Sequence, residues 1–343
     1  MPSPSSLPVS PFVFAACRAG SEAALKADVA RRHAGQLTPA FMRPQLITWK
    51  SKEALPASFE LGSPLARVSG FSIGSFASVT ELAQKLQEQN LREIAIEVAP
   101  REISEDGVID WSGPEAVQTA LHAAVSAAGL TLINAPQAGD AVLSVLVDAS
   151  GAKPLFAGLH SHRVGLSTQL PRLVLPAHAP SRAWLKLEQA LAWRGWDAEE
   201  LRGLTALDLG CAPGGASLAL LDRGVRVLGV DTGDMDESVL RHDSGGFRQL
   251  RVPLARLDIE KLPAHVDLIL CDINLAPPEV LPHVARLQAA LRAQRLILTL
   301  KMNSDAHERR MDEYLKFIRG FAPAPVHATQ LAANRREICV TAG

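Results

Sequence analysis

Four charged residues in the second half of the sequence have the types and positions that acid–base chemistry needs. They are Lys186 in a predicted helix, Asp272 at the end of a predicted strand, Lys301 directly after another, and Glu337 at the start of the last one. A lysine has an unperturbed pKa of about 10.4, and burial or a second cation lowers it. We therefore expect Lys301, beside Lys186, to be neutral part of the time. It could then accept a proton from a hydroxyl group within hydrogen-bond reach.

The two acids complete this set. Asp272 would orient Lys301, and Glu337 would hold Lys186 in place. Each residue taken alone also has a plainer interpretation. Lys301 could be a solvated lysine at a strand end, and Glu337 could form a weak surface ion pair with a neighbouring arginine.

A glycine-rich turn lies in the same half of the chain. Residues Asp208–Gly215 read Asp-Leu-Gly-Cys-Ala-Pro-Gly-Gly, between a predicted strand and a predicted helix. Gly210 and Gly214 allow the backbone to turn tightly and to approach a ligand closely. The spacing differs from the Gly-x-Gly-x-x-Gly pattern that binds dinucleotides.

Acidic residues accompany this turn. Asp208 precedes it, and Asp231 and Asp272 end two later predicted strands. Ligands of open parallel sheets bind at the carboxyl ends of the strands, so we expect the three acids to surround one crevice. They would repel the pyrophosphate of NAD. They would favour a ligand with hydroxyl groups and a positive centre, which suits S-adenosylmethionine. The alternative is a tight turn that binds no ligand.

Alternating strands and helices must position these residues. Apolar runs in the second half predict strands that include Thr205–Leu209, Val225–Val230, Val266–Cys271 and Arg295–Leu300, with helices between them. This alternation is typical of a doubly wound α/β fold with a mainly parallel sheet. The first half mixes predicted strands and helices less regularly and reads as α+β.

Composition limits the class of protein. The chain has 343 residues and a formal net charge of −1, which suggests about two domains. No apolar run approaches the ~20 residues of a membrane span, so we expect no membrane association. Four scattered cysteines without a Cys-x-x-Cys pair argue against a disulfide scaffold and a cysteine-based zinc site. We expect a cytoplasmic monomer without a metal, whose Pro/Ser-rich residues 1–11 form a disordered tail.

Charge is distributed unevenly along the chain. Residues 51–150 contain five basic and thirteen acidic side chains, whereas residues 151–186 contain five basic and none that is acidic. This acid-free strip, residues 151–186, is either a footprint for phosphate groups or an interdomain linker. We hypothesise an RNA-binding surface formed by the N-terminal region, the strip and the crevice. His160 and His162 are expected at the surface or against RNA rather than on a metal.

Five segments carry a resemblance to a known family, namely SRAWLKLEQAL, DLGCAPGGAS, LILCDINLAP, LTLKM and RREICVTAG. Together they resemble the FtsJ-type 2′-O-ribose methyltransferases, and especially the ribosomal RNA large subunit methyltransferase M (RlmM) family. The resemblance is strong from Pro171 to Gly343 and weaker, but collinear, before that. It implies a THUMP-like α+β RNA-binding region at residues 12–160, a basic linker at 161–180 and a Rossmann-like methyltransferase domain at 181–343.

The resemblance also implies an activity and a set of site residues. The family uses S-adenosylmethionine to methylate the 2′-hydroxyl of a cytidine in 23S rRNA, so we expect that rRNA or its precursor as the substrate. Lys186, Asp272, Lys301 and Glu337 match the catalytic tetrad, with Lys301 as the proton acceptor. The residues implied for donor binding are Ser181, Asp208, Gly210, Ala212, Pro213, Gly214, Gly215, Asp231, Asp258 and Asp272. Ser181 and Asp258 stand near, rather than at, the family's serine and adenine-side acid.

Three other functions stay open. The same chemistry could act on another RNA, such as tRNA or a different rRNA site. The chain could also be an RNA-binding protein with a degenerate methyltransferase domain, although the complete tetrad counts against this. A nicotinamide oxidoreductase is the third, and the missing Gly-x-Gly-x-x-Gly pattern counts against it.

Overall fold

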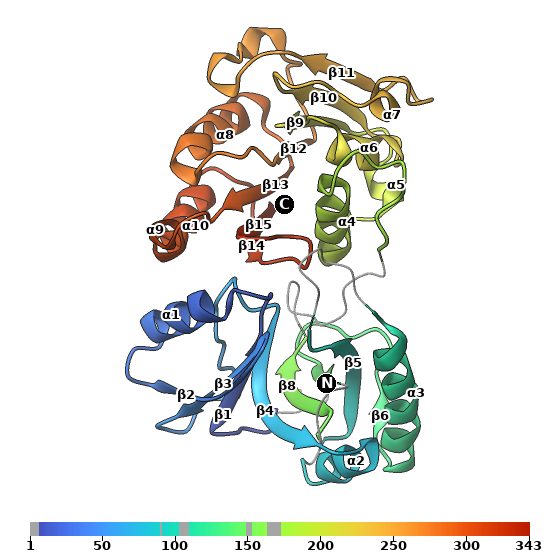
Figure 1. Cartoon of the computed structure of the whole chain (residues 1–343), viewed down its shortest axis with the longest axis vertical. Coiled ribbons are helices and arrows are strands. Elements are labelled where there is room, and N and C mark those ends of the chain that lie inside the picture. The colour runs from blue at the N-terminus through green and yellow to red at the C-terminus, as the bar shows by residue number, and fades with distance from the viewer. Residues whose placement is uncertain (1–6, 90, 103–109, 149–152, 163–172) are drawn as a thin grey trace. The chain divides into compact units, whose positions relative to one another are not determined.

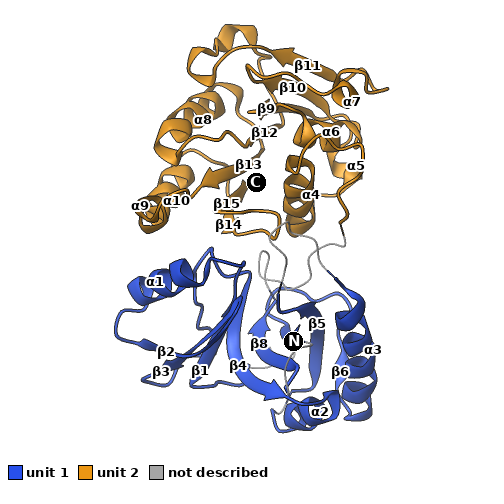
Figure 2. Ribbon diagram, in the orientation of Figure 1, with its two compact units in different colours: residues 1–170 blue, residues 171–343 orange. Residues whose placement is uncertain are grey.

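The chain divides into two compact units, residues Met1–Leu170 (unit 1) and Pro171–Gly343 (unit 2), which Figure 2 shows in separate colours. The computed structural model describes residues 7–89, 91–102, 110–148, 153–162 and 173–343. The boundary between the units falls within the linker expected at residues 161–180, much of which lies outside the described residues, as do Arg163 and Arg172 of the acid-free strip.

Unit 1 is a mixed sheet with helices packed against it (Figure 1). Its strands are β1 (Phe12–Ala16), β2 (Leu37–Arg43), β3 (Leu46–Ser51), β4 (Val68–Phe76), β5 (Glu93–Pro100), β6 (Thr131–Leu132), β7 (Ala141–Val147) and β8 (Leu155–Ser161). Its helices are α1 (Glu22–Arg32), α2 (Val79–Gln87) and α3 (Ser112–Ala127). The strand order is β2-β3-β1-β4-β8-β7-β5-β6. β5 runs parallel to β6 and β7, and the remaining neighbours are antiparallel.

Local sequence explains much of unit 1. Ser78 begins α2 because its hydroxyl accepts a hydrogen bond from the amide of Glu81, and the Glu81 carboxylate in turn accepts one from the amide of Ala77. This reciprocal pairing satisfies amides that the first turn of a helix leaves free. Leu82 and Leu86 then face the core of the unit. The interpretation of unit 1 as a THUMP-like RNA-binding region stays a prediction.

β8 is a central strand between β4 and β7. Two expectations for the first half of the chain are wrong. His160 is buried in β8 and its Nε2 lies 2.9 Å from the Ser144 hydroxyl, so it is not a surface histidine. Leu7 packs in the core of unit 1, so the disordered tail expected at residues 1–11 does not reach that far, and residues 1–6 lie outside the described residues.

Unit 2 is an α/β layer structure. Its strands are β9 (Thr205–Leu209), β10 (Arg226–Val230), β11 (Phe247–Leu250), β12 (Leu268–Cys271), β13 (Arg295–Lys301), β14 (Val326–Thr329) and β15 (Glu337–Ala342). Its α-helices are α4 (Ala183–Arg194), α5 (Ala198–Leu201), α6 (Gly215–Leu221), α7 (Glu237–Leu240), α8 (Pro277–Leu291), α9 (Asp305–Arg309) and α10 (Met311–Arg319). Two short 3₁₀ turns are η1 (Leu254–Arg256) and η2 (Ile259–Lys261).

The strand order of unit 2 is β11-β10-β9-β12-β13-β15-β14. The strands from β11 to β13 are parallel, and β15 is antiparallel to both β13 and β14. Figure 1 shows α4 and α6 on one side of this sheet and α8 and α10 on the other. The expected doubly wound, mainly parallel Rossmann-like fold is therefore confirmed. Of the helices in the described ranges, none has the length and apolar character needed to cross a membrane.

Candidate active site

The four charged residues come together at the carboxyl edge of the unit 2 sheet. Asp272 follows β12 and Lys301 ends β13, and these two strands are parallel neighbours. Glu337 begins β15 and pairs directly with Lys301, because β15 runs antiparallel to β13. Lys186 reaches the same point from α4. The topology therefore brings together residues that lie up to 151 positions apart.

Each lysine contacts both carboxylates. Lys301 Nζ donates hydrogen bonds to Asp272 Oδ1 and to Glu337 Oε1, each at 2.6 Å. Lys186 Nζ lies 3.1 Å from Asp272 Oδ2 and 2.8 Å from Glu337 Oε2. Two cations and two anions therefore alternate around a closed ring, which we call the tetrad. Such mutual pairing offsets the cost of removing four charges from water.

The ion pairs within the tetrad determine the protonation of its members. Burial alone would lower the pKa of Lys301, but Asp272 and Glu337 attract and hydrogen-bond its ammonium, and the net effect raises that pKa. The expectation of a partly neutral Lys301 is therefore wrong for this arrangement. Burial would raise the pKa of Glu337, yet the two lysines outweigh burial and lower it to about 2. Both groups are charged at neutral pH.

The glycine-rich turn joins β9 to α6 at the same sheet edge. Gly210 and Gly214 have φ angles of 83° and 119°, which residues other than glycine rarely adopt. A Cβ atom at Gly214 would lie 2.5 Å from Val239 Cγ2, and one at Gly215 would lie 2.3 Å from Ser181 Oγ. Ser181 therefore packs against the start of α6, as a residue near the turn should.

Asp231 ties the turn to the next strand. Its Oδ2 accepts a hydrogen bond from the amide of Ala212 at 3.1 Å, and its Oδ1 accepts one from the amide of Gly233 at 2.8 Å. The Pro213 carbonyl accepts a hydrogen bond from the amide of Asp236 at 2.9 Å. A carboxylate has about four acceptor positions, so Asp231 keeps capacity for hydroxyl groups of a ligand.

Asp208 lies below the turn rather than at the rim. It is 1% exposed, and the Ser217 hydroxyl donates a 2.7 Å hydrogen bond to its Oδ2. Burial chiefly, with the negative Asp272 and Asp231, raises the pKa of Asp208 to about 7, although the Ser217 hydrogen bond opposes this. Asp208 is therefore partly protonated at neutral pH, and the expectation that the three acids surround one crevice stays a prediction. Asp208 lines a small cavity that Lys186 and Asp272 also line.

Asp258 is the one implied donor-binding residue that the structure does not bring to this group. It is exposed and begins η2, where its Oδ1 accepts a hydrogen bond from the amide of Glu260 at 3.0 Å. No contact within the described ranges ties it to the glycine turn. Its role beside an adenine stays a prediction.

Asn334 is a residue that sequence reasoning missed. It is completely buried, its Oδ1 accepts a 2.9 Å hydrogen bond from the amide of Leu331, and its Nδ2 lies 3.4 Å from Glu337 Oε2. Gln189 Oε1 accepts a 2.8 Å hydrogen bond from the amide of Ala333 in the same loop. The loop is therefore fixed directly before Glu337. The sequence signal is an asparagine, a common turn residue, three positions before the acid.

The geometry suits one class of ligand. The positive-φ glycines let the turn, which we call the cradle, pack closely against Ile273 and Val239, and the carboxylates of Asp231 and Asp272 favour a ligand with hydroxyl groups and a positive centre. Over the described part of the chain, no group of three His, Cys, Asp or Glu residues is placed to hold a metal ion. The tetrad adjoins this cradle through Asp272 and Asp208.

Comparisons with known proteins find similarity to RNA methyltransferases. Residues 179–307 match the FtsJ-like methyltransferase family. The ribosomal RNA large subunit methyltransferase M of Azoarcus sp. (strain BH72) is 29% identical over 216 residues, which cover 58% of this chain and 56% of that protein. The protein of the same name from Cellvibrio japonicus (strain Ueda107) is 36% identical over 137 residues, 39% of this chain and 38% of that protein.

These matches are partial in length. The chain spans about half the length, or less, of the curated relatives it matches. Among solved structures, TrmN from Thermus thermophilus aligns with 96% of this chain at 16% identity and a TM-score of 0.35, and 99% of that chain is covered. The residues that match the FtsJ-like family model, 179–307, all lie in unit 2.

Proposed function

We propose that this chain, an FtsJ-like methyltransferase similar to the ribosomal RNA large subunit methyltransferases M, methylates the 2′-hydroxyl of an RNA ribose. The substrate is 23S rRNA or its precursor, at a cytidine, and the methyl donor is S-adenosylmethionine. The observation that carries the proposal is the tetrad at the sheet edge beside the glycine-rich turn. The family match and the curated relatives support the same reaction.

The residues around the turn fit S-adenosylmethionine. Gly210, Gly214 and the backbone between them would hold it, and Asp231 would accept hydrogen bonds from its ribose hydroxyls. Asp272, at the end of β12, would offset the charge of its sulfonium. When bound, S-adenosylmethionine supplies an electrophilic methyl carbon whose leaving group is a neutral thioether, so the transfer depends on positioning.

The tetrad positions a proton acceptor for the RNA hydroxyl. Asp272 and Glu337 fix Lys301 Nζ by two short hydrogen bonds. Lys186 contacts both carboxylates and balances their second negative charge. Lys301 accepts a proton only after it has lost its own, and its raised pKa makes that form scarce at neutral pH. The chemical step should therefore speed up as the pH rises.

Methyl transfer from labelled S-adenosylmethionine to unmodified 23S rRNA tests this proposal. We expect label in a 2′-O-methyl cytidine with the wild type and a loss of about a thousandfold with Lys301→Ala, within the range that a general base contributes. Lys316→Ala is the matched control, because Lys316 is exposed on α10. Donor binding is measured in parallel by calorimetry.

The outcomes separate the alternatives. Equal label with Lys301→Ala and the wild type would exclude Lys301 as the proton acceptor. The protein could bind the donor and transfer the methyl group to tRNA or to another rRNA site instead of the expected 23S rRNA site. That RNA would then be the substrate. The absence of donor binding would leave an RNA-binding protein with a degenerate methyltransferase domain.

A further inference from the structure

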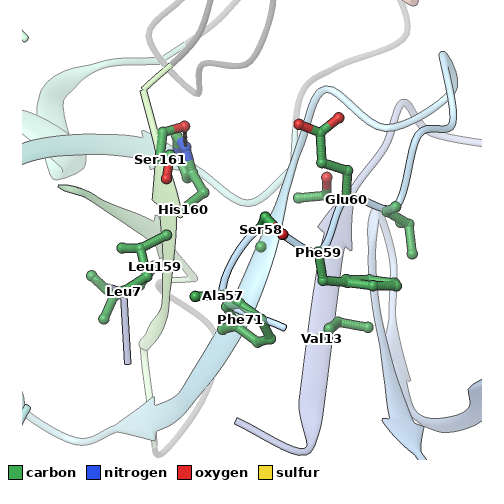
Figure 3. A pocket seen from close by; sticks show the side chains of 13 residues that line it. Leu7, Val13, Ala57, Ser58, Phe59, Glu60, Phe71, Leu159, His160 and Ser161 are labelled. Atoms are coloured by element: carbon green, nitrogen blue, oxygen red, sulfur yellow. Dashed lines mark hydrogen bonds between the residues drawn. The ribbon is translucent and has the colours of Figure 1, made fainter. Parts of the chain in front are cut away.

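Unit 1 contains a cavity of about 170 Å³ that the reaction above does not use (Figure 3). Its floor is a row of three apolar side chains on adjacent strands, Val13 of β1, Phe71 of β4 and Leu159 of β8. Val13 pairs with Phe71 and Phe71 pairs with Leu159, so the three lie side by side on one face of the sheet. Figure 3 shows Leu159 and Ser161 on one side of the cavity and Phe59 on the other.

The remaining wall is a fixed segment of chain. Residues Ala57–Leu61 line the cavity, and the Phe59 ring lies 5.1 Å, centroid to centroid, from the His33 ring. His33 is held in turn by a 3.0 Å contact between its Nε2 and the Leu61 carbonyl. Ser58 and Glu60 of the same segment are exposed, so the cavity opens to solvent. Phe59 thus offers a preformed aromatic surface.

The size of the cavity limits the ligand. A cavity of about 150 Å³ accommodates one benzene-sized ring, and drug-sized ligands require roughly 300 Å³ or more. The cavity of about 170 Å³ therefore matches a single six-membered ring, and the second ring of a fused base would extend beyond it.

The lining also defines the chemistry of the ligand. Ser69 is 4% exposed and Ser161 is half-buried, and neither hydroxyl has a hydrogen-bond partner within the described ranges. Among the residues that the structure describes, no lysine or arginine lines the cavity, and burial lowers the pKa of His160, which stays neutral. Glu60 adds a negative charge at the opening. A phosphate is disfavoured here, and a neutral ring with donors and acceptors on its edge is favoured.

We propose that this cavity, floored by Val13, Phe71 and Leu159, binds one unstacked pyrimidine base of a single-stranded RNA segment. The inference rests on the proposed function because that function supplies the RNA. Phe59 and Phe71 present aromatic surface to the base, and the Ser69 and Ser161 hydroxyls bond its edge. RNA-binding proteins commonly bind bases of unpaired segments by aromatic contact and edge hydrogen bonds. Unit 1 thereby captures a nucleotide apart from the one that is methylated.

Binding of a labelled, single-stranded pyrimidine decamer to the 343-residue chain tests the proposal by fluorescence anisotropy. Ser69→Ala combined with Ser161→Ala should weaken binding about twentyfold, the factor that two neutral hydrogen bonds typically contribute. The matched control is Ser72→Ala combined with Ser75→Ala, because both serines are half-buried on β4 and neither lines the cavity. Equal affinities for the two double variants would overturn the proposal.

A second measurement needs no substitution. A decamer containing 4-thiouridine is photo-crosslinked to the wild type, and the modified peptides are identified by mass spectrometry. Crosslinks within residues 57–61 or 69–71 support the proposal if free cytidine, added before irradiation, reduces their yield more than N-acetyltyrosinamide does. Crosslinks confined to unit 2 overturn it. Stronger displacement by N-acetyltyrosinamide also overturns it and points to an aromatic side chain of a protein partner.

These experiments separate the two proposals. If the serine variant binds the decamer weakly while the wild type transfers no methyl group to any RNA, the methyltransferase proposal fails and the base site stands. If the wild type methylates 23S rRNA and the serine variant binds the decamer as tightly as its control, the base site fails alone.

Discussion

Lys301 of unit 2 and Arg67 of unit 1 are both buried cations, and they are partnered in opposite ways. In unit 2, Lys301 is 8% exposed and donates hydrogen bonds to two carboxylates. In unit 1, Arg67 is 4% exposed, and none of its three guanidinium nitrogens has a hydrogen-bond partner within the described ranges. The pKa of Lys301 is raised, whereas burial lowers that of Arg67 to about 10. Burial alone thus does not set the protonation of a cation, because its neighbours can reverse the direction.

Sheet topology explains why only one of the two cations is paired. The parallel strands of unit 2 end at one edge, and β15 begins there, so that Asp272, Lys301 and Glu337 meet. Arg67 precedes β4, whose two neighbours, β1 and β8, are both antiparallel to it. The ionisable group that influences its pKa is the buried Cys17 thiol, whose own pKa is raised to about 12 by burial above all. A neutral thiol does not compensate a guanidinium.

Removing the paired cation should have the largest effect on stability. Lys301→Met should lower the free energy of unfolding by about 3 kcal/mol, because Asp272 and Glu337 would share Lys186 alone. Urea denaturation at pH 7 measures this, and Lys316→Met, at an exposed position, should change the value by less than about 0.5 kcal/mol. Equal losses in both variants would mean that the tetrad does not stabilise the fold.

The raised pKa of Lys301 predicts the pH dependence of methyl transfer. The fraction of neutral Lys301 grows about tenfold per pH unit below its pKa, so the single-turnover rate should rise about a hundredfold from pH 7 to pH 9, equal to about 2.7 kcal/mol. The Arg67→Met variant should keep the same profile, since Arg67 lies in the other unit. A rate independent of pH would contradict proton acceptance by Lys301.

The carboxylate side of the tetrad makes stability sensitive to acid. The pKa of Glu337 falls from an ordinary 4.5 to about 2, so its contribution is present above pH 4.5 and is lost as the pH falls toward 2. The difference in unfolding free energy between the wild type and Glu337→Gln should therefore shrink by about 3 kcal/mol across this window. Urea denaturation from pH 6 to pH 3 follows the first part of the change. A constant difference would show that the lysines do not stabilise the charged form.

The unpaired cation should give the smallest effect, with the opposite sign. Arg67→Met removes buried donors that lack acceptors and should raise the free energy of unfolding by about 1 kcal/mol. Arg92→Met is the control, because Arg92 is exposed in the same unit and should have little effect. If Arg67→Met lost more stability than the control, Arg67 would stabilise the fold, as Lys301 is expected to do.

The sequence predicts the strands of unit 2 better than those of unit 1 for a physical reason. Strands buried on both faces read as continuous apolar runs, and Asp272 and Lys301 mark where two such runs end. β8 lacks a comparable signal because Gly158 interrupts it. A Cβ atom at Gly158 would lie 2.0 Å from Phe14 Cε1, so this glycine admits the Phe14 ring. That requirement comes from a strand far away in sequence.

Residue types and apolar runs along the chain are enough to indicate the α/β fold, the glycine-rich turn and the four charged residues of the tetrad. The folded arrangement adds that Lys301 keeps its proton, that Asp208 is buried with a pKa of about 7, and that Asn334 supports Glu337. A pKa depends on distances and burial, and neither follows from the order of residues along the chain.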